Sequence, residues 1–267
     1  SSTDTVGILA NNTQDVATVL QVMAGKDPYD GTTIERSKDN YAKIKTSLKG
    51  KKIGLIKEQT GDGVEKEVLE SVNNAVETLK NAGAQITDVS LPSLPLSLAV
   101  YYIVVPAEIS SNLSRYDGQK YGYSAPDVKD ITDSYNKSRS IGFGKEAKRR
   151  IMIGTYVLSS GYYDAYYKKA QTVRTKLINE FNDIFSKVDY LIGPTAPTVA
   201  FKIGQNTADP LQMYLSDVMT VGASLVGIPA ISVPTKTKGL PVGIQIMAPQ
   251  HKDKELLAVA AAFEEAR

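Results

Sequence analysis

The stretch from Lys52 to Leu91 reads KIGLIKEQTGDGVEKEVLESVNNAVETLKNAGAQITDVSL, and it decides the fold class. Its first five residues are typical of a strand, and the residues from Gly63 to Leu79 carry apolar side chains on one face of a helix. Asn81-Ala-Gly83 closes that helix, and Ala84 to Leu91 resumes an extended pattern. The order strand, helix, strand predicts a parallel or mixed sheet with helices packed on it.

Further elements are expected on both sides of this unit. A short apolar run from Val6 to Ala10 is typical of a strand, and the middle of the chain, from Leu96 to Lys187, is predicted to be mostly helical. The later segments are predicted strands from Val188 to Gly193, Pro229 to Pro234 and Val242 to Ala248, and predicted helices from Pro210 to Leu225 and Asp253 to Ala266. We therefore predict an α/β fold, a mixed β-sheet covered by α-helices on both faces, in a single domain from residue 1 to 267.

The composition excludes several classes of chemistry. The chain has no cysteine and one histidine, His251, so Cys/His metal sites and nucleophile–imidazole pairs have almost no residues to use. A net charge of +2 is too small to predict nucleic-acid binding by itself. No run approaches the roughly 20 apolar residues that span a bilayer, and no signal peptide is present, so a cytoplasmic protein is expected. The first residue is Ser1 rather than Met, and the expected strand already begins at Val6, which suggests a fragment.

Arg150 is a candidate binding residue because of its place on an expected helix. A helix that begins near Lys145 puts Ala147, Arg150, Ile151 and Gly154 on one stripe, which turns the guanidinium toward the protein body. A buried guanidinium without a partner is very costly, so an anionic group is expected against it. That group is either an internal Asp or Glu or an anionic ligand, and the pattern alone favours the internal salt bridge.

Asp217 raises the same question, since it borders the apolar stripe of the helix expected from Pro210 to Leu225. Its carboxylate could hold a substrate ammonium group or could pair with Arg150. An Arg and an Asp that both face inward without neutralising each other would form a clamp for a zwitterionic amino acid. The residue pattern leaves these alternatives open.

The tyrosines from Tyr162 to Tyr167, followed by two lysines, allow two interpretations. Aromatic rings beside basic residues can stack on bases. Packing between helices, with the lysines reaching to solvent, is the interpretation that we favour.

Several segments together resemble one family. The segments are SSNLSRYDG from Ser110 to Gly118, YGY from Tyr121 to Tyr123, GFGKEAKRRI from Gly142 to Ile151, LSSGYYDAYYKK from Leu158 to Lys169, GPTAP from Gly193 to Pro197 and GIPAISVP from Gly227 to Pro234. They resemble the A subunits of bacterial glutamyl-tRNA(Gln) or aspartyl-tRNA(Asn) amidotransferases, which are members of the amidase signature family. The resemblance runs nearly from end to end and implies the amidase-signature fold, with its N-terminal part missing here.

The resemblance implies an activity and a set of partners. The family's A subunit is a glutaminase, and its ammonia converts a glutamyl-tRNA(Gln), or an aspartyl-tRNA(Asn), to the amide. It works with B and C subunits in a heterotrimer, where ATP and Mg²⁺ are used by the partner and tRNA is bound mainly through the B subunit. No cofactor, metal or membrane contact is expected for this chain.

The resemblance also implies where the functional residues lie. The family's catalytic Ser, bridging Ser and Lys belong to Gly/Ser-rich stretches that this chain lacks, since it contains no Gly-Gly pair. They are expected upstream of Ser1, so the chain alone is predicted to be inactive. The family's residues for glutamine fall on Tyr101, on Arg150 for the α-carboxylate and on Asp217 for the α-ammonium. Two alternatives stay open: a stand-alone amidase for small amides, and a non-catalytic binding or assembly module.

Overall fold

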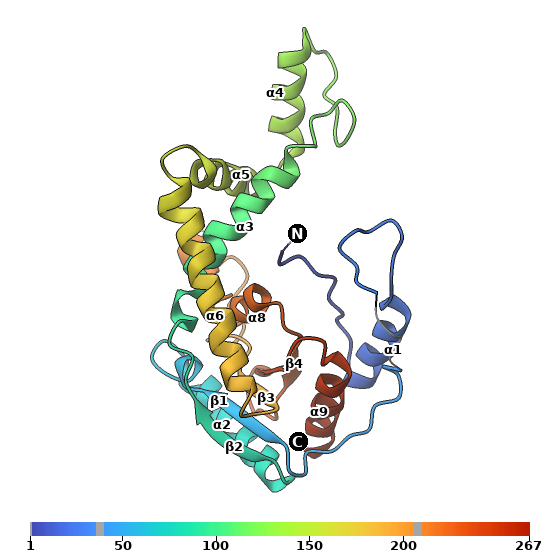
Figure 1. The fold of residues 1–267 in the computed structure, drawn as a ribbon, viewed down its shortest axis with the longest axis vertical. Helices are drawn as coiled ribbons and strands as arrows, with labels where there is room; N and C mark the ends of the chain where they lie inside the picture. Colours follow the sequence, from blue (N-terminus) through green and yellow to red (C-terminus); the bar gives the residue numbers. More distant parts are fainter. Residues whose placement is uncertain (1, 36–39, 206–209) are drawn as a thin grey trace. The chain divides into compact units, whose positions relative to one another are not determined.

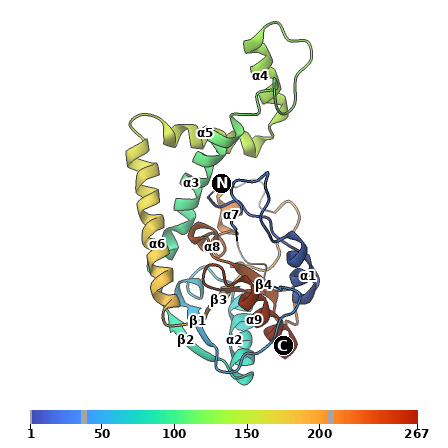
Figure 2. The ribbon, with the colours of Figure 1, turned by 45° about the vertical axis from the view of Figure 1, so that its right-hand side comes forward.

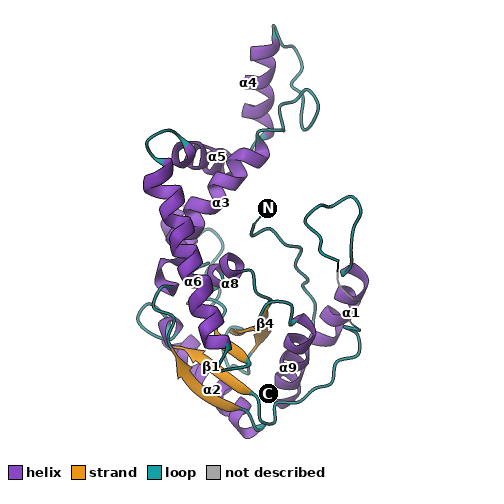
Figure 3. Cartoon of the chain, in the orientation of Figure 1, coloured by secondary structure: helices purple, strands orange, loops and turns teal. Residues whose placement is uncertain are grey.

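A computed structural model describes residues 2–35, 40–205 and 210–267. The chain divides into two compact units, Ser1–Leu98 with Lys176–Arg267, and Ala99–Thr175. The first is called the sheet unit, because it holds every strand of the described residues, and the second is called the helical unit (Figure 3). The expectation of a single domain from residue 1 to 267 stays a prediction.

The strands of the described residues form one five-stranded mixed sheet in the order β2-β1-β3-β5-β4. These strands are β1 (Lys52–Ile56), β2 (Gln85–Val89), β3 (Tyr190–Pro194), β4 (Ala230–Pro234) and β5 (Gly243–Met247). β1 runs parallel to β2 and β3, whereas β5 runs antiparallel to β3 and β4. The predicted strand, helix and strand are confirmed as β1, α2 (Lys66–Asn81) and β2 (Figure 1).

The core on one face of the sheet is formed with α2 and α9 (Asp253–Ala266). The apolar face of α2 is buried at Val68, Val72, Ala75, Val76 and Leu79, which is the helical spacing read from the sequence. These helices pack with Ile53, Ile192 and Ile246 of the strands, each at most 1% exposed. Full burial of side chains of this size stabilises the fold by about 1.5–3 kcal/mol each.

The opposite face of the sheet is buried as well. Successive side chains of a strand point to opposite sides, so Leu191 and Met247 alternate with the residues of the first face. Both are buried, as are Phe181 of α6 (Lys169–Phe185) and Leu225 of α8 (Val221–Val226). Helices therefore cover both faces of the mixed sheet, as the sequence predicts.

The first helix, α1 (Thr13–Met23), is fixed at its start by a side-chain cap. The Asn12 side chain accepts a 2.8 Å hydrogen bond from the backbone N–H of Asp15, which satisfies one of the free donors at the helix start. Ala17 of α1 is buried in a small cluster with Tyr41 and Leu257 of α9. This cluster places α1 beside α9 within the sheet unit (Figure 2).

The helical unit is built from α3, α4 and α5, joined to α6 by a π-helical turn, and this confirms the predicted helical middle. The bounds are α3 (Ser97–Leu113), α4 (Ile131–Gly142), α5 (Lys145–Leu158) and the turn η3 (Tyr163–Lys168). α5 crosses α3 at Gly154, where a Cβ atom would lie 1.9 Å from the carbonyl oxygen of Pro106. Beside this crossing, the hydroxyls of Ser110 and Thr155 share a 2.8 Å hydrogen bond.

Two expectations about secondary structure are wrong. The run from Val6 to Ala10 has no regular structure, and Val6 is 80% exposed, because no described strand lies beside it to pair with its backbone. The helix expected from Pro210 to Leu225 is broken into α7 (Pro210–Leu215) and α8 by a turn over residues 216–220. In that turn the backbone tightens to i→i+3 hydrogen bonds, such as the one from Thr220 N–H to the Asp217 carbonyl.

One helical segment bears on the membrane expectation. Among the described residues, Leu94–Leu113 is one weak candidate for a membrane-crossing helix, since its 20 residues are apolar enough by length and composition alone. It contains Glu108 in its second half, and 39% of its most apolar 18-residue window is buried. The core helix of a soluble protein meets the same criterion.

Candidate functional site

Arg150 lies on α5 in the orientation that its spacing predicts. α5 begins at Lys145, directly after its N-cap Gly144. The Arg150 side chain is 22% exposed, whereas the neighbouring Arg149 side chain is 45% exposed. The guanidinium of Arg150 is therefore turned toward the interior of the helical unit, and the guanidinium of Arg149 toward solvent.

Three side chains of the helical unit meet the Arg150 guanidinium. Nε donates a 2.9 Å hydrogen bond to the Glu146 carboxylate, four residues earlier on the same helix. The Tyr101 hydroxyl accepts a further hydrogen bond, and the guanidinium carbon lies 5.6 Å from the ring centroid of Tyr102. The two tyrosine rings of α3 are 5.1 Å apart in an edge-to-face arrangement. We call these four residues the arginine cluster.

The arginine cluster keeps its positive charge. Burial alone lowers the pKa of Arg150, but the hydrogen bonds to Glu146 and Tyr101 outweigh burial, so the pKa lies above its ordinary value. A guanidinium carries five N–H donors in a planar fork, and the Glu146 ion pair is made through Nε, the donor on the stem side. Such a group can recognise a carboxylate with charge-assisted hydrogen bonds.

Two members of the arginine cluster were missed from the sequence. The internal salt bridge expected for Arg150 is present, and its acid is Glu146. The spacing of four residues between Glu146 and Arg150 is the signal that could have identified this pair. Tyr102 carried no signal beyond its place next to Tyr101, since only the contact with Arg150 across α3 and α5 defines its role.

Asp217 lies in the sheet unit, in the turn between α7 and α8. Its carbonyl accepts hydrogen bonds from the backbone N–H groups of Thr220 (3.0 Å) and Val221 (3.3 Å), and from the Thr220 hydroxyl (3.1 Å). The turn is therefore closed by the Asp217 backbone, and the residue as a whole is exposed. The structure brings Tyr101 and Arg150 together within the helical unit, and Asp217 belongs to the other compact unit.

The tyrosines after α5 stack on one another. The ring centroids of Tyr156 and Tyr162 are 4.3 Å apart, and those of Tyr162 and Tyr166 are 6.0 Å apart. Their side chains remain 41–49% exposed. The favoured interpretation, packing between helical segments, agrees with these contacts between α5 and η3.

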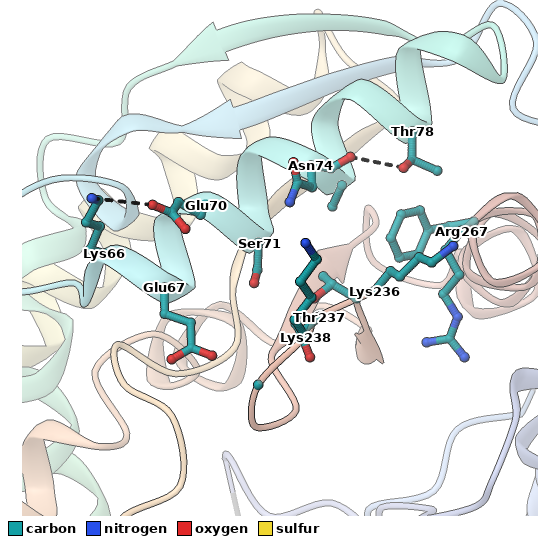
Figure 4. A pocket seen from close by; sticks show the side chains of 14 residues that line it. Lys66, Glu67, Glu70, Ser71, Asn74, Thr78, Lys236, Thr237, Lys238 and Arg267 are labelled. Atoms are coloured by element: carbon teal, nitrogen blue, oxygen red, sulfur yellow. Dashed lines mark hydrogen bonds and ion pairs between the residues drawn. The ribbon is translucent and has the colours of Figure 1, made fainter.

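A cavity of about 940 Å³ lies in the sheet unit, and none of the predicted site residues lines it. It is lined by α2, by the loop from Thr235 to Gly239 and by the end of α9. Its charges are mixed: Lys66 pairs with Glu70 at 3.7 Å, and Lys236, Lys238 and Arg267 face the same space (Figure 4). Across the described ranges, no group of three or more His, Cys, Asp or Glu side chains is arranged to hold a metal ion.

Ser159, the first of the paired serines that follow α5, has an ordinary structural role. Ser159 is the C-cap of α5, and its hydroxyl donates a 2.7 Å hydrogen bond to the Tyr156 carbonyl. This is the local side-chain bond that is common at helix ends. The geometry gives no reason to treat Ser159 as a nucleophile.

Solved structures define the class of fold. The chain superposes on a bacterial aryl acylamidase of the amidase signature enzymes with a TM-score of 0.72 and 21% identity, over 96% of this chain and 51% of that one. It superposes on the A subunit of the glutamyl-tRNA(Gln) amidotransferase of Thermotoga maritima with a TM-score of 0.73 and 33% identity, over 99% of this chain and 53% of that one. The fold is thus the mixed α/β fold of the amidase-signature structures.

Sequence comparison narrows this class to a family. A family model described as Amidase matches residues 1–257, and the chain belongs to the amidase family. It is 50% identical, over its whole length, to the A subunit of the glutamyl-tRNA(Gln) amidotransferase of Caldanaerobacter subterraneus subsp. tengcongensis, and 48% identical to that of Chromobacterium violaceum. The chain spans about half the length of these relatives, 55% and 56%.

Proposed function

We propose that this chain is part of a glutaminase subunit of a tRNA-dependent amidotransferase. The whole subunit hydrolyses glutamine and supplies ammonia for the conversion of glutamyl-tRNA(Gln), or aspartyl-tRNA(Asn), to the amidated form. The proposal is supported by membership of the amidase family and by about 50% identity to proteins that carry this name. The observation that carries it is the arginine cluster, because a half-buried guanidinium is suited to the α-carboxylate of a free amino acid.

The roles of the substrate residues follow from this proposal. Arg150 binds the α-carboxylate of glutamine, and the Tyr101 hydroxyl, already hydrogen-bonded to Arg150, contacts the substrate beside it. Asp217 accepts hydrogen bonds from the α-ammonium group. A charge-assisted hydrogen bond contributes about 1.5–3 kcal/mol, so the two charged contacts together select glutamine over amides that lack these groups.

The rest of the reaction needs residues outside this chain. We place the nucleophilic Ser, the bridging Ser and the Lys base of the Ser-Ser-Lys amidase mechanism upstream of Ser1, so this chain alone is inactive. A desolvated Lys can relay the Ser proton as imidazole does elsewhere, which suits a chain with one His and no Cys. We further propose that B and C subunits complete a cytoplasmic heterotrimer, in which the partner uses ATP and Mg²⁺ and the B subunit binds most of the tRNA.

A comparison of two amides tests the proposed function. In the complete subunit, together with its partners, we expect kcat/KM for L-glutamine to exceed that for propionamide by at least about 100-fold, because propionamide offers neither charged group. Ammonia release measures both reactions. Equal values would favour a stand-alone amidase for small amides, and no ammonia from either would favour a binding or assembly module. Either result would overturn the proposal.

A further inference from the structure

Two buried glutamines of the sheet unit lie outside the arginine cluster and outside the predicted set of residues. Gln59 follows β1 in the 3-10 turn η1 (Lys57–Gln59), and Gln245 is the central residue of β5. Each is only 3% exposed. Gln59 Nε2 donates a 2.8 Å hydrogen bond to the Met219 carbonyl, and Gln245 Nε2 donates a 2.9 Å hydrogen bond to the same oxygen. The two amides thus saturate the two lone pairs of one backbone carbonyl.

A glycine in β3 makes this convergence possible. Gly193 lies directly opposite Gln245 in the β3–β5 pair, and β3 lies between β1 and β5. A Cβ atom at Gly193 would be 2.1 Å from Gln59 Oε1. The Gln59 side chain therefore passes over β3 at the one residue without a side chain, and so reaches Met219 beside Gln245.

The orientation of the Gln59 amide is fixed by the Met219 carbonyl. Turning the amide would place Oε1 against another oxygen, so Nε2 must face Met219. Gln59 Oε1 is then buried without a hydrogen-bond donor among the described residues. An unsatisfied buried acceptor costs about 1–3 kcal/mol, and this cost accompanies the two hydrogen bonds that hold Met219, one from η1 and one from β5.

Met219 belongs to the turn that carries Asp217, two residues earlier. Regular helix hydrogen bonding is interrupted over residues 216–220, so the position of the turn depends on other contacts. These contacts include the pair of glutamine bonds at Met219 and the bonds that the Asp217 carbonyl accepts from Thr220 and Val221 at the start of α8. The turn is therefore hydrogen-bonded to the sheet unit through Met219 and to the start of α8 through Asp217.

We infer that Gln59 and Gln245 are positioning residues for the Asp217 carboxylate. Their two hydrogen bonds to the Met219 carbonyl hold the 216–220 turn against the sheet. The preference for substrates that carry an α-ammonium group depends on this position of the turn. This inference rests on the role proposed above for Asp217. Neither glutamine touches the substrate, so their loss changes the recognition of the ammonium group rather than the chemistry at the amide.

The test uses a substrate that differs from glutamine only in the ammonium group. 4-Carbamoylbutanoate keeps the carboxylate and the amide and lacks the α-amino group. In the complete subunit with its partners, we expect Gln59→Met to raise KM for glutamine about tenfold, to change kcat less than threefold, and to leave kcat/KM for 4-carbamoylbutanoate nearly unchanged. A merely structural loss would lower kcat/KM for both substrates alike.

Three further variants make the outcomes decisive. Gln85→Met, on the exposed edge strand β2, is the matched control and should leave KM and kcat unchanged for both substrates. Gly193→Ala keeps both glutamines but displaces the Gln59 side chain, and should reproduce the loss even where Gln59→Met does not fold. Asp217→Asn should abolish the preference for glutamine over 4-carbamoylbutanoate. If Asp217→Asn abolishes this preference and the Gln59 and Gly193 variants keep it, the inference is overturned while the proposed function stands. If Asp217→Asn itself keeps the preference, both the role of Asp217 and the inference are overturned.

Discussion

Arg150→Ala is expected to raise KM for glutamine by about 100-fold or more in the complete subunit with its partners. In the proposed site the substitution removes two charge-assisted hydrogen bonds to the α-carboxylate, each worth about 1.5–3 kcal/mol, and a factor of ten in kcat/KM corresponds to about 1.4 kcal/mol. It also removes one of the two arginines that pair with the Glu146 carboxylate. Steady-state ammonia release over a range of glutamine concentrations measures this effect.

Arg149→Ala is the matched control for that experiment. Arg149 is the next residue on α5, is also paired with Glu146, and is twice as exposed as Arg150, at 45% against 22%. It should leave glutamine kinetics within about twofold, because an exposed ion pair contributes little. Arg150→Lys keeps the charge but loses the planar fork, and should give an intermediate KM. Unchanged glutamine kinetics in Arg150→Ala would remove Arg150 from the substrate site.

Gly154→Ala is expected to lower the free energy of unfolding by about 3 kcal/mol. A Cβ atom at this position would lie 1.9 Å from the Pro106 carbonyl oxygen and 2.6 Å from Ser110 Cβ, so the crossing of α3 and α5 must open. Backbone atoms cannot turn aside as the end of a side chain can, and overpacking of this kind typically costs about 1–3 kcal/mol, occasionally more. The opening also strains the 2.8 Å bond between Ser110 and Thr155.

Thermal unfolding measures the effect of Gly154→Ala. A loss of about 3 kcal/mol lowers Tm by roughly 6–12 °C in a chain of this size. Gly144→Ala is the control, since Gly144 is the N-cap of the same helix and a Cβ atom there meets nothing within 4 Å. It should cost about 0.5–1 kcal/mol, because Ala is a poorer N-cap than Gly, and so much less than Gly154→Ala. Equal Tm values for the two variants would show that the close crossing at Gly154 is not required.

The parts of the fold that were predicted correctly are those with a strong local period. The stretch from Lys52 to Leu91 alternates, then repeats at helical spacing, and then becomes extended, and it folds as β1, α2 and β2. The buried side of α5 also followed from spacing, since Arg150 and Gly154 lie on the same stripe. These features depend on residues that are close together along the chain, so one sequence is enough to predict them.

The features that failed depend on contacts between distant residues. The apolar period continues through residues 216–220, yet the helix breaks there, where the Met219 carbonyl is bonded to Gln59 of η1 and to Gln245 of β5. The run from Val6 to Ala10 has the composition of a strand, but a strand exists only when another strand pairs with it. Neither outcome can be read from the local pattern.

In the candidate site, too, local spacing predicted some residues and missed those that depend on contacts between distant segments. Periodicity alone pointed to Arg150 and Asp217, while Tyr101 came only from the family resemblance. The structure adds Tyr102 and Glu146 to Arg150, and the spacing of Glu146 on the same helix was available from the sequence. Gln59, Gly193 and Gln245 gave no signal, because the turn η1 and the strands β3 and β5 that carry them come together only in the folded chain.

The most direct test of the account is ammonia release from L-glutamine by this chain alone and, in parallel, by the complete gene product together with its partner subunits. We predict glutamine-dependent ammonia from the complete assembly and none from this chain, because the proposed nucleophile and base lie outside it. Ammonia from this chain alone would contradict the account. It would show that the nucleophile is among the residues described above, and that Ser159 and Ser160 must be reconsidered.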